Sequence, residues 1–330
     1  MTPTLRRTRS VSLATSVLVV AVTLAGCAQS VSPASSGAST PSSGSSAAVG
    51  VTRSAAPTPA AAKPAAVAPA GPTPWSGTRQ PPAGIAWSHV SASPGLAVAT
   101  VDGGNVTLMW MDPSLLRFRF VPGTKWPERS PMTAADSQSS TWTAHLVAAF
   151  NGGFKLSDHV GGYYYQGHVV APLLNGDAAL AVRRDGSLSV GVWGNDLTMS
   201  PDLVVVRENL HPIVLNGVSQ AKASDTPTTW GLTLQHLRAV NRSALGQLAD
   251  GSLVFVFGHL IIPQTVAREL IAAGAQQAMM LDMNVTWPTG FLYSRTGGRF
   301  QGTKINPHIK RSPSIYLAQF EKDFVAVESR

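Results

Sequence analysis

Apolar and polar residues are arranged along this chain in short runs separated by turn sequences. The clearest pair of apolar runs, 243–248 and 252–257, flanks Asp250-Gly251, and such a dipeptide tolerates positive φ. A second pair, 178–182 and 188–192, flanks Asp185-Gly186 in the same way. Each of the two patterns predicts a β-hairpin.

A helix is predicted directly after the first hairpin. Pro263 suits a first helical turn, because its missing N–H would have no partner there. Residues 265–273 contain no helix breaker, their apolar side chains recur at helical spacing, and Gly274 is a plausible stop. The next apolar run, 278–281, has the length of a buried strand and is followed at once by Asp282. A unit that delivers polar groups at the end of a buried strand commonly builds a site.

The rest of the pattern after residue 95 adds mainly strands. A second helix is a candidate near 141–149, and 288–313 is expected to be rich in loops. Many strands with one or two helices predict an α+β fold, with a mixed or antiparallel sheet rich in hairpins. The further predicted strands are 96–101, 106–111, 115–121, 203–206, 212–215, 314–320 and 324–327.

Residues 1–27 have the pattern of an export signal. Three arginines between residues 6 and 9 precede the apolar stretch 11–21, which is short for a membrane span. The stretch ends in Leu24-Ala25-Gly26-Cys27, which resembles the bacterial lipobox, whose cysteine is diacylated. A diacylglycerol group at Cys27 would attach the protein stably to a membrane. The alternative is an ordinary secretory signal with a chance cysteine.

Residues 28–75 are predicted to be a disordered linker, because alanine, serine and proline dominate and little apolar surface can be buried. The folded domain is then expected at 76–330. Together with the signal, this organisation predicts a lipid-anchored protein on the extracytoplasmic face of the cell membrane.

Charge and cysteine content exclude several classes of function. The net charge is +8, but charged residues make up only 13% of the chain and no basic helix with interleaved aromatics occurs. We therefore expect no nucleic-acid partner; an anionic surface or a phosphate ligand fits the charge equally well. With one cysteine, intrachain disulfides and cysteine-based metal sites are excluded. No cofactor is predicted, although a divalent cation held by Asp282 and a substrate phosphate is an alternative.

Two further stretches carry candidate site residues. Asn151-Gly152-Gly153 follows an apolar run and marks either a tight turn or a close backbone approach. His168 ends the glycine- and tyrosine-rich stretch 161–168, whose aromatic rings suit sugar rings or simply cover a sheet. His168 could act as a general acid or base, whereas a lone loop histidine more often does neither.

Three separated segments together resemble the phosphodiester glycosidase domain family. They are Ala-Phe-Asn-Gly-Gly-Phe at 149–154, the hairpin with Asp-Gly-Ser-Leu at 242–253, and the helix and strand that end at Asp282. The resemblance covers about residues 95–327. Better-known members carry Asp-Gly-Gly-Gly-Ser after the last strand, whereas side chains follow Asp282 here, at 283–287. The family's fold is therefore implied more firmly than its reaction.

The resemblance implies cleavage of a bond between sugar C1 and a phosphate oxygen. A carboxylate near C1 acts as nucleophile or base, and Asp282 is the candidate. Arg242 suits the phosphate, because a guanidinium binds phosphate oxygens bidentately. Asn151 with the Gly152 backbone could bind sugar hydroxyls or phosphate, and Asn284 could hold Asp282 in position. Structural roles for these residues, in turns and buried ion pairs, are the alternative.

The sequence thus predicts a membrane-anchored extracytoplasmic hydrolase of glycosyl phosphodiesters or related cell-wall glycan linkages. The alternative is a non-catalytic lipoprotein on the same fold that binds wall carbohydrate through its tyrosines, Trp230 and Trp287. A structural envelope lipoprotein without a ligand is a third possibility, and it predicts no concave polar site around Asp282.

Overall fold

The computed structural model describes residues 79–158, 160–232 and 237–330. The predicted export signal at 1–27, with Cys27, and the predicted linker at 28–75 lie outside these residues. Among the residues described, no helix is both long enough and apolar enough to cross a membrane.

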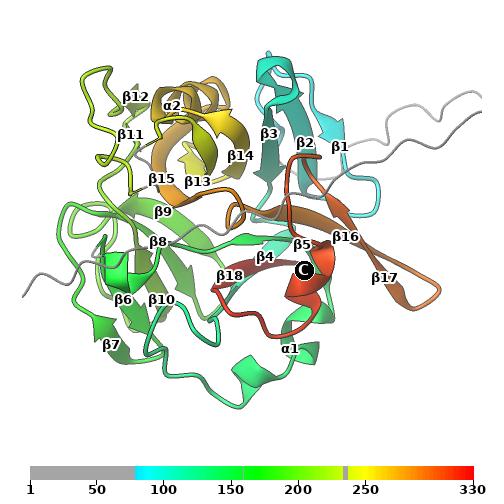
Figure 1. Ribbon diagram of the computed structural model, residues 1–330. Coiled ribbons are helices and arrows are strands. Elements are labelled where there is room, and N and C mark those ends of the chain that lie inside the picture. Colours follow the sequence, from blue (N-terminus) through cyan, green and yellow to red (C-terminus); the bar gives the residue numbers. More distant parts are fainter. Residues whose placement is uncertain (1–78, 159, 233–236) are drawn as a thin grey trace, which may run out of the picture. The chain divides into compact units, whose positions relative to one another are not determined.

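The described residues form three antiparallel sheets, shown in Figure 1. The first contains, in spatial order, β1 (Ser88–His89), β2 (Leu96–Val101), β3 (Val106–Met111), β14 (Leu253–Ile261), β13 (Val240–Leu248), β15 (Ala275–Met283), β11 (Val214–Leu215) and β12 (Val218–Ser219). The second contains β7 (His168–Ala171), β6 (Tyr163–Tyr165), β10 (Leu203–Glu208), β8 (Ala178–Arg183) and β9 (Leu188–Val192). The third contains β17 (Arg299–Lys304), β16 (Gly290–Thr296), β5 (Leu146–Asn151), β18 (Phe324–Ser329) and β4 (Leu116–Val121).

Helices are short and few among the described residues. They are α1 (Ser140–Thr143) and α2 (Pro263–Ala272), with 3-10 turns at Asp102–Gly104, Ala135–Ser137, Leu156–Asp158 and Pro313–Leu317. The predicted α+β class, with hairpin-rich antiparallel sheets and one or two helices, is confirmed.

The predicted hairpin, helix and strand at the centre of the first sheet are confirmed. β13 pairs with β14 on one side and with β15 on the other, and Ser243 lies opposite Asp282. Pro263 stands in the first turn of α2, and Gly274 follows the helix with φ of 84°, a conformation that favours glycine. The fully buried side chains of Val266 and Leu270 turn the apolar face of α2 toward the sheet.

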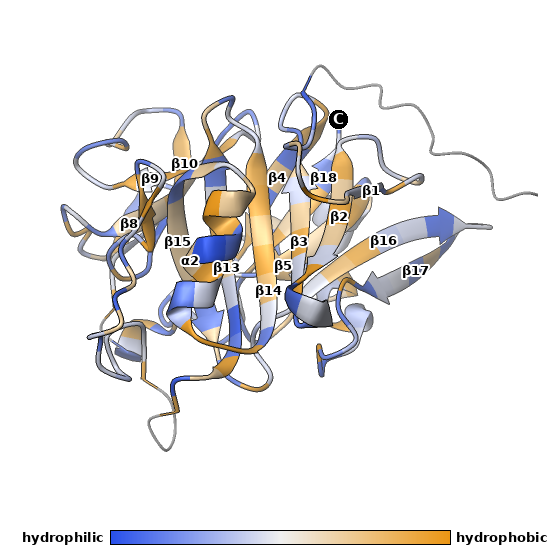
Figure 2. Cartoon of the chain, turned by 90° about the horizontal axis from the view of Figure 1, so that it is seen from above, coloured by the Kyte–Doolittle hydropathy of each residue, from blue (hydrophilic) through white to orange (hydrophobic). Residues whose placement is uncertain are grey.

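The central strands are buried on both faces, which explains their continuous apolar runs. Leu245, Phe255 and Met279 belong to a core shared with β4, β5 and β18. Their sequence neighbours Ala244, Val254 and Met280 belong to a second core under α2. Figure 2 shows β14 as an almost uniformly hydrophobic strand beside α2, whose polar residues face outward. The end of β15 is therefore fixed by packing from two sides.

Three predictions of secondary structure were wrong. The candidate helix at 141–149 is one helical turn, α1, followed by β5, which pairs with β16 and β18. The predicted strand at 314–320 is a 3-10 turn, in which the Ser312 hydroxyl accepts a hydrogen bond from Ser314 N at 3.3 Å. The segment 288–313 contains the hairpin of β16 and β17, which projects from the body in Figures 1 and 2.

Candidate active site

Asp282, at the end of β15, lines a cavity of about 540 Å³. The cavity lies between the chain that follows β5, residues 231–232 and 237–240, and the loop after β15. Its described lining residues are Phe154, Lys155, Ser157, Asp158, Val160, Gly231, Leu232, Leu237, Val240, Asp282, Met283, Asn284, Val285, Trp287 and Lys322. A concave polar site therefore forms around Asp282. The alternative of a structural envelope lipoprotein without a ligand predicted no such site.

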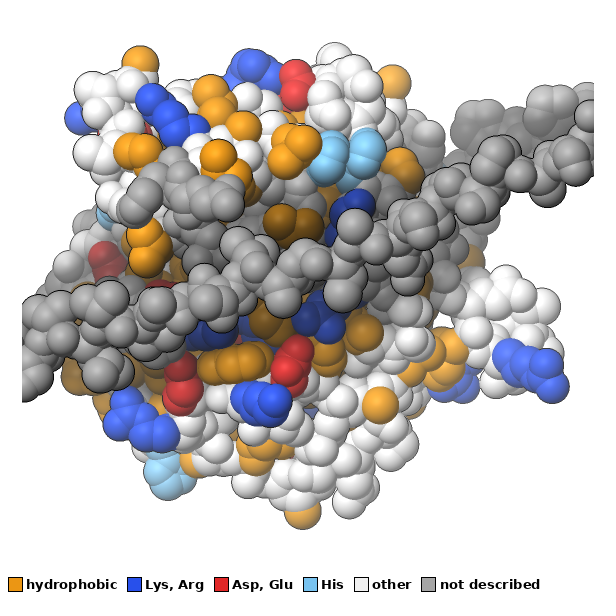
Figure 3. Space-filling view, in the orientation of Figure 1, with side chains coloured by type: hydrophobic (Ala, Val, Ile, Leu, Met, Phe, Trp, Pro, Cys, Tyr) orange, Lys and Arg blue, Asp and Glu red, His pale blue; other side chains and the backbone are white. Residues whose placement is uncertain are grey.

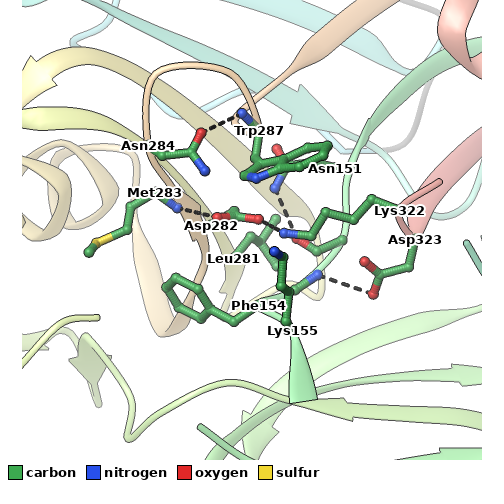
Figure 4. A network of polar contacts seen from close by, with 12 residues as sticks. Asn151, Phe154, Lys155, Leu281, Asp282, Met283, Asn284, Trp287, Lys322 and Asp323 are labelled. Carbon is green, nitrogen blue, oxygen red and sulfur yellow. Dashed lines mark hydrogen bonds and ion pairs between the residues drawn. The ribbon is translucent and has the colours of Figure 1, made fainter. Parts of the chain in front are cut away.

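Both carboxylate oxygens of Asp282 have partners. Oδ1 accepts a hydrogen bond from Met283 N at 2.6 Å, and Oδ2 forms an ion pair with the ammonium group of Lys322. The two side chains are each 3% exposed. Figure 4 shows them pointing toward one another, with Trp287 and Lys155 beside them. The carboxylate at the end of β15 is thus compensated by a lysine that lies 40 residues further along the chain.

Lys322 is a candidate site residue that the sequence analysis did not single out. It directly precedes Asp323 and β18, and its Nζ lies 5.2 Å from the centroid of the Trp287 ring. Burial lowers the pKa of Lys322 to about 7, against the attraction of Asp323. A lysine with such a pKa can change its charge near neutral pH, which suits proton transfer or pH-dependent anion binding.

Asp323 explains the glycine at 152, and Asn209, 2.7 Å from where a Cβ atom of residue 153 would lie, explains the glycine at 153. Asp323 Oδ2 accepts hydrogen bonds from Gly153 N at 3.3 Å and Arg207 Nε at 3.4 Å. A Cβ atom on Gly152 would lie 2.5 Å from Asp323 Cγ, so no side chain fits there. Burial raises the pKa of Asp323, against the nearby charges of Arg207 and Lys322. Of the two sequence interpretations of this glycine pair, the close backbone approach is confirmed.

Asn151 lies next to Asp282 and is connected to it through Ser243. Asn151 Nδ2 donates to Ser243 Oγ and to Gly152 O, both at 2.9 Å, and Asn151 Oδ1 accepts from Thr289 N at 3.0 Å. Ser243 Oγ in turn accepts from Asp282 N at 3.2 Å. The structure therefore brings Asn151 to Asp282, where it fixes the backbone around the carboxylate and uses both amide hydrogens to do so.

Arg242 points away from Asp282, because neighbouring residues of a strand face opposite sides of the sheet. Its guanidinium donates to the carbonyl oxygens of Ile261 at 3.1 Å, Trp230 at 3.3 Å and Arg238 at 3.0 Å. Burial lowers the pKa of Arg242 to about 10, and it has no carboxylate partner among the described residues. The structure places Arg242 at a separate small cavity beside Trp230 and gives it backbone partners.

Asn284 shapes the loop after β15. Its Oδ1 accepts hydrogen bonds from Thr286 N and Trp287 N, each at 2.7 Å, and it also lines the cavity. It holds the Trp287 backbone, and no hydrogen bond to Asp282 is formed. His168 lies elsewhere: it is exposed on β7, at the edge of the second sheet, and does not line the cavity.

The cavity wall combines cations with aromatic rings. Lys155 Nζ lies 4.2 Å from the centroid of the Trp126 ring, and that ring packs edge-on against Trp287 at 5.8 Å. Lys155 and Lys322 repel one another, which contributes to the lowered pKa of Lys322. An anion placed between them would relieve this repulsion. The only sequence signal for Lys322 was a Lys-Asp pair between Phe320 and Phe324.

No metal site is evident in the part of the chain that the structure describes. No group of three or more histidine, cysteine or acidic side chains there could hold a metal ion. The described lining of the cavity supplies two carboxylates, Asp158 and Asp282, the ammonium groups of Lys155 and Lys322, and aromatic surfaces.

The chain is similar to one protein family and to several proteins of solved structure. Residues 144–282 match the family model for phosphodiester glycosidase, whereas no curated protein matches the chain. The zebrafish N-acetylglucosamine-1-phosphodiester α-N-acetylglucosaminidase catalytic domain, auto-inhibited by its pro-peptide, aligns over 73% of this chain and 86% of its own, with 17% identity and a TM-score of 0.44. A Synechocystis protein of solved structure aligns over 74% of this chain and 64% of its own, with 12% identity and a TM-score of 0.46. Residues 144–282, which end at Asp282, are thus similar to the phosphodiester glycosidase domain family.

Proposed function

We propose that this protein is a membrane-anchored extracytoplasmic hydrolase that cleaves glycosyl phosphodiesters between sugar C1 and a phosphate oxygen. The observation that carries the proposal is the Asp282–Lys322 pair, which lies at a cavity with aromatic walls and includes Asp282, the last residue of the matched segment. A carboxylate beside an ammonium group supplies both charges that this reaction needs, one for the cation-like sugar and one for the phosphate.

The substrate phosphate competes with Asp282 for Lys322. A phosphodiester bound by Lys322 and Lys155 replaces the carboxylate as the partner of the lysine ammonium group, and Asp282 Oδ2 is then free to approach C1. The sugar ring lies against Trp287 and Phe154, whose flat apolar faces suit it.

In the reaction the C1–O bond breaks and its electron pair leaves with the phosphate monoester. Water supplies a hydroxyl group to C1, either directly with Asp282 as base or by hydrolysis of a sugar ester of Asp282. The remaining proton of water passes to the carboxylate or to solvent. The leaving phosphate needs little protonation, so the charge of Lys322 stabilises the departing oxygens and no separate strong acid is required.

The substrate assay uses the full chain. It is incubated with an N-acetylglucosamine-1-phosphodiester, with a simple alkyl glycoside of the same sugar and with a phosphate monoester, and free sugar and released monoester are measured. Release of both products from the phosphodiester alone supports the proposal. No release from it overturns the proposal.

The membrane anchor is part of the proposal and rests on the sequence 24–27. Metabolic labelling with a fatty acid is expected to mark the wild-type protein and to miss a Cys27→Ser variant. Equal labelling of the two proteins would overturn the anchor, and the assay above is independent of it.

A second function is favoured by one specific observation. Both oxygens of Asp282 are occupied, and side chains stand at 283–287 where better-known family members carry glycines. On this reading the protein binds wall carbohydrate without cleaving it, through Trp287 and the cavity. Glycan binding that is lost in Trp287→Ala, without any turnover by the wild type, would favour this second function.

A further inference from the structure

A second cavity, of about 450 Å³, lies beside the cavity of Asp282. Ser157 lines both of them, so the two hollows are neighbours that meet at one short turn. The second cavity is lined by Glu128, Arg129, Leu156, Ser157, Gly161, Ala171, Pro172 and Leu174. None of these residues except Ser157 belongs to the site described above.

The turn at which the cavities meet is held in place by a carboxylate. It is the 3-10 turn Leu156–Asp158, and Glu128 accepts hydrogen bonds from Leu156 N at 2.9 Å and Ser157 N at 3.4 Å. These bonds to Ser157 and Leu156 lower the pKa of Glu128, against the effect of its partial burial. Glu128 is therefore charged at neutral pH and already engaged, so it does not neutralise a cation in the second cavity.

Arg129 is the cation of the second cavity. Its side chain is exposed, and within the described part of the chain its guanidinium forms no hydrogen bond or ion pair. Its backbone has φ of 61°, a conformation that a residue with a side chain adopts at a cost of order 1 kcal/mol or more. A strained backbone that presents an unpaired guanidinium to a hollow is an arrangement that a ligand can use.

The remaining surface of the second cavity is largely apolar. Leu156, Ala171, Pro172 and Leu174 contribute side chains without charge, and Gly161 contributes none. The second cavity thus combines an apolar surface with one guanidinium. The first cavity has a similar composition, because aromatic rings lie beside Lys155 and Lys322 there. The two cavities thus repeat one chemistry: an apolar surface for a ring and a cation for an anionic group.

We propose that the two cavities are adjacent subsites for a chain-like ligand that carries repeated anionic groups between sugar units. One phosphate lies at Lys155 and Lys322, and the next lies at Arg129, in the cavity that meets the first at the turn Leu156–Asp158. The identification of the anionic group as phosphate rests on the proposed function. The prediction that the ligand is an oligomer rests on the paired cavities.

The test is a binding experiment with the full chain, so that it does not depend on turnover. Affinities are measured calorimetrically for a glycosyl phosphodiester with one phosphate and for oligomers with two and three phosphates, for wild type and Arg129→Ala. Arg299→Ala is the matched control, because Arg299 is an equally exposed arginine on β17, in the projecting hairpin. The wild type is expected to bind the two-phosphate ligand about tenfold more tightly than the one-phosphate ligand.

Arg129→Ala is expected to lose this tenfold preference while its affinity for the one-phosphate ligand stays within about twofold of wild type. Arg299→Ala is expected to keep the preference. Equal affinity of the wild type for all ligands overturns the inference, and so does an Arg129→Ala variant that keeps the preference. Tighter binding of the two-phosphate ligand without hydrolysis would support the second subsite and overturn the proposed hydrolase. Hydrolysis without this preference would support the hydrolase and overturn the second subsite.

Discussion

The carboxylate of Asp282 and the ammonium group of Lys322 form a buried ion pair, although Asp282 ends β15 in the first sheet and Lys322 lies just before β18 of the third sheet. Each side chain is 3% exposed, so neither charge is well solvated without the other. The pair stands at the edge of the cavity, and each charge compensates the other. The stability of the fold and the proposed function therefore depend on the same contact.

Replacing Lys322 by methionine is expected to destabilise the protein by about 3 kcal/mol, because Asp282 is left as an uncompensated buried charge. The measurement is chemical denaturation of both proteins at pH 7. Lys125→Met is the control: Lys125 pairs with Glu321 at 3.7 Å and is 65% exposed, so its loss should cost less than about 1 kcal/mol. A Lys322→Met variant as stable as the control would contradict the structural role of the pair.

Anion binding is expected to weaken as the pH rises through about 7, the pKa to which burial lowers Lys322. Below that pH the ammonium group is charged and attracts the phosphodiester; above it the neutral amine does not. Because one charge-assisted contact is lost, the affinity at pH 8.5 is expected to be about tenfold weaker than at pH 6. The probe is a methyl phosphodiester of the sugar, whose own charge is constant over this range.

Lys322→Arg serves as the control for this pH dependence, because a guanidinium stays protonated throughout. The arginine variant is expected to bind the probe with an affinity that changes less than about twofold from pH 6 to pH 8.5. The same decline in both proteins would show that another group titrates.

Gly152→Ala is expected to destabilise the protein by about 3 kcal/mol, at the upper end of overpacking costs. The new Cβ would lie 2.5 Å from Asp323 Cγ, and Asp323 is buried with Arg207 and cannot move aside. Gly103→Ala is the comparison: Gly103 has φ of 64° and open space around it, so only the backbone term of about 1 kcal/mol applies. Equal losses in thermal or denaturant unfolding would disprove the close approach as the reason for Gly152.

Arg242→Lys separates a structural from a catalytic role of Arg242. A lysine cannot reach the three carbonyl oxygens that Arg242 contacts, so unfolding free energy is expected to fall by about 2–3 kcal/mol. Turnover per folded molecule and KM should stay within about twofold, since the guanidinium points away from Asp282. A normal unfolding free energy combined with a large loss of kcat/KM would restore Arg242 to the phosphate site.

Basic and acidic side chains are interspersed on the face shown in Figure 3, and they do not merge into one basic patch there. On this face the charges are thus spread out, as the scattered arginines of the sequence indicated. The candidate cations of the proposed site, Lys322 and Lys155, are distinguished by their place at the cavity and not by local charge density.

The central unit could be predicted because its signals are local. The Asp250-Gly251 turn, the helical spacing after Pro263 and the apolar run before Asp282 each act within a few residues, and packing on both faces reinforces them. This is why the end of β15 and the candidate carboxylate were found from the sequence.

The parts of the fold and of the candidate site that the sequence did not predict depend on contacts between residues that are distant in the chain. The hairpin of β16 and β17 has polar, exposed residues such as Arg295 and Thr296, so its strands lack the usual alternation. Lys322 reads as a surface residue, and only the pairing of β18 beside β5 carries it to Asp282. Arg242 and Ser243 are neighbours, and the strand period alone decides that Ser243 faces the site.

The measurement that tests the central claim most directly compares the hydrolysis of an N-acetylglucosamine-1-phosphodiester by wild type, Asp282→Asn and Asp158→Asn. Asp158 lines the same cavity but is exposed, so it is the matched acid. The account predicts that Asp282→Asn lowers kcat at least about a thousandfold while the protein still binds the substrate, and that Asp158→Asn changes kcat less than about fivefold. Equal turnover by wild type and Asp282→Asn would contradict it.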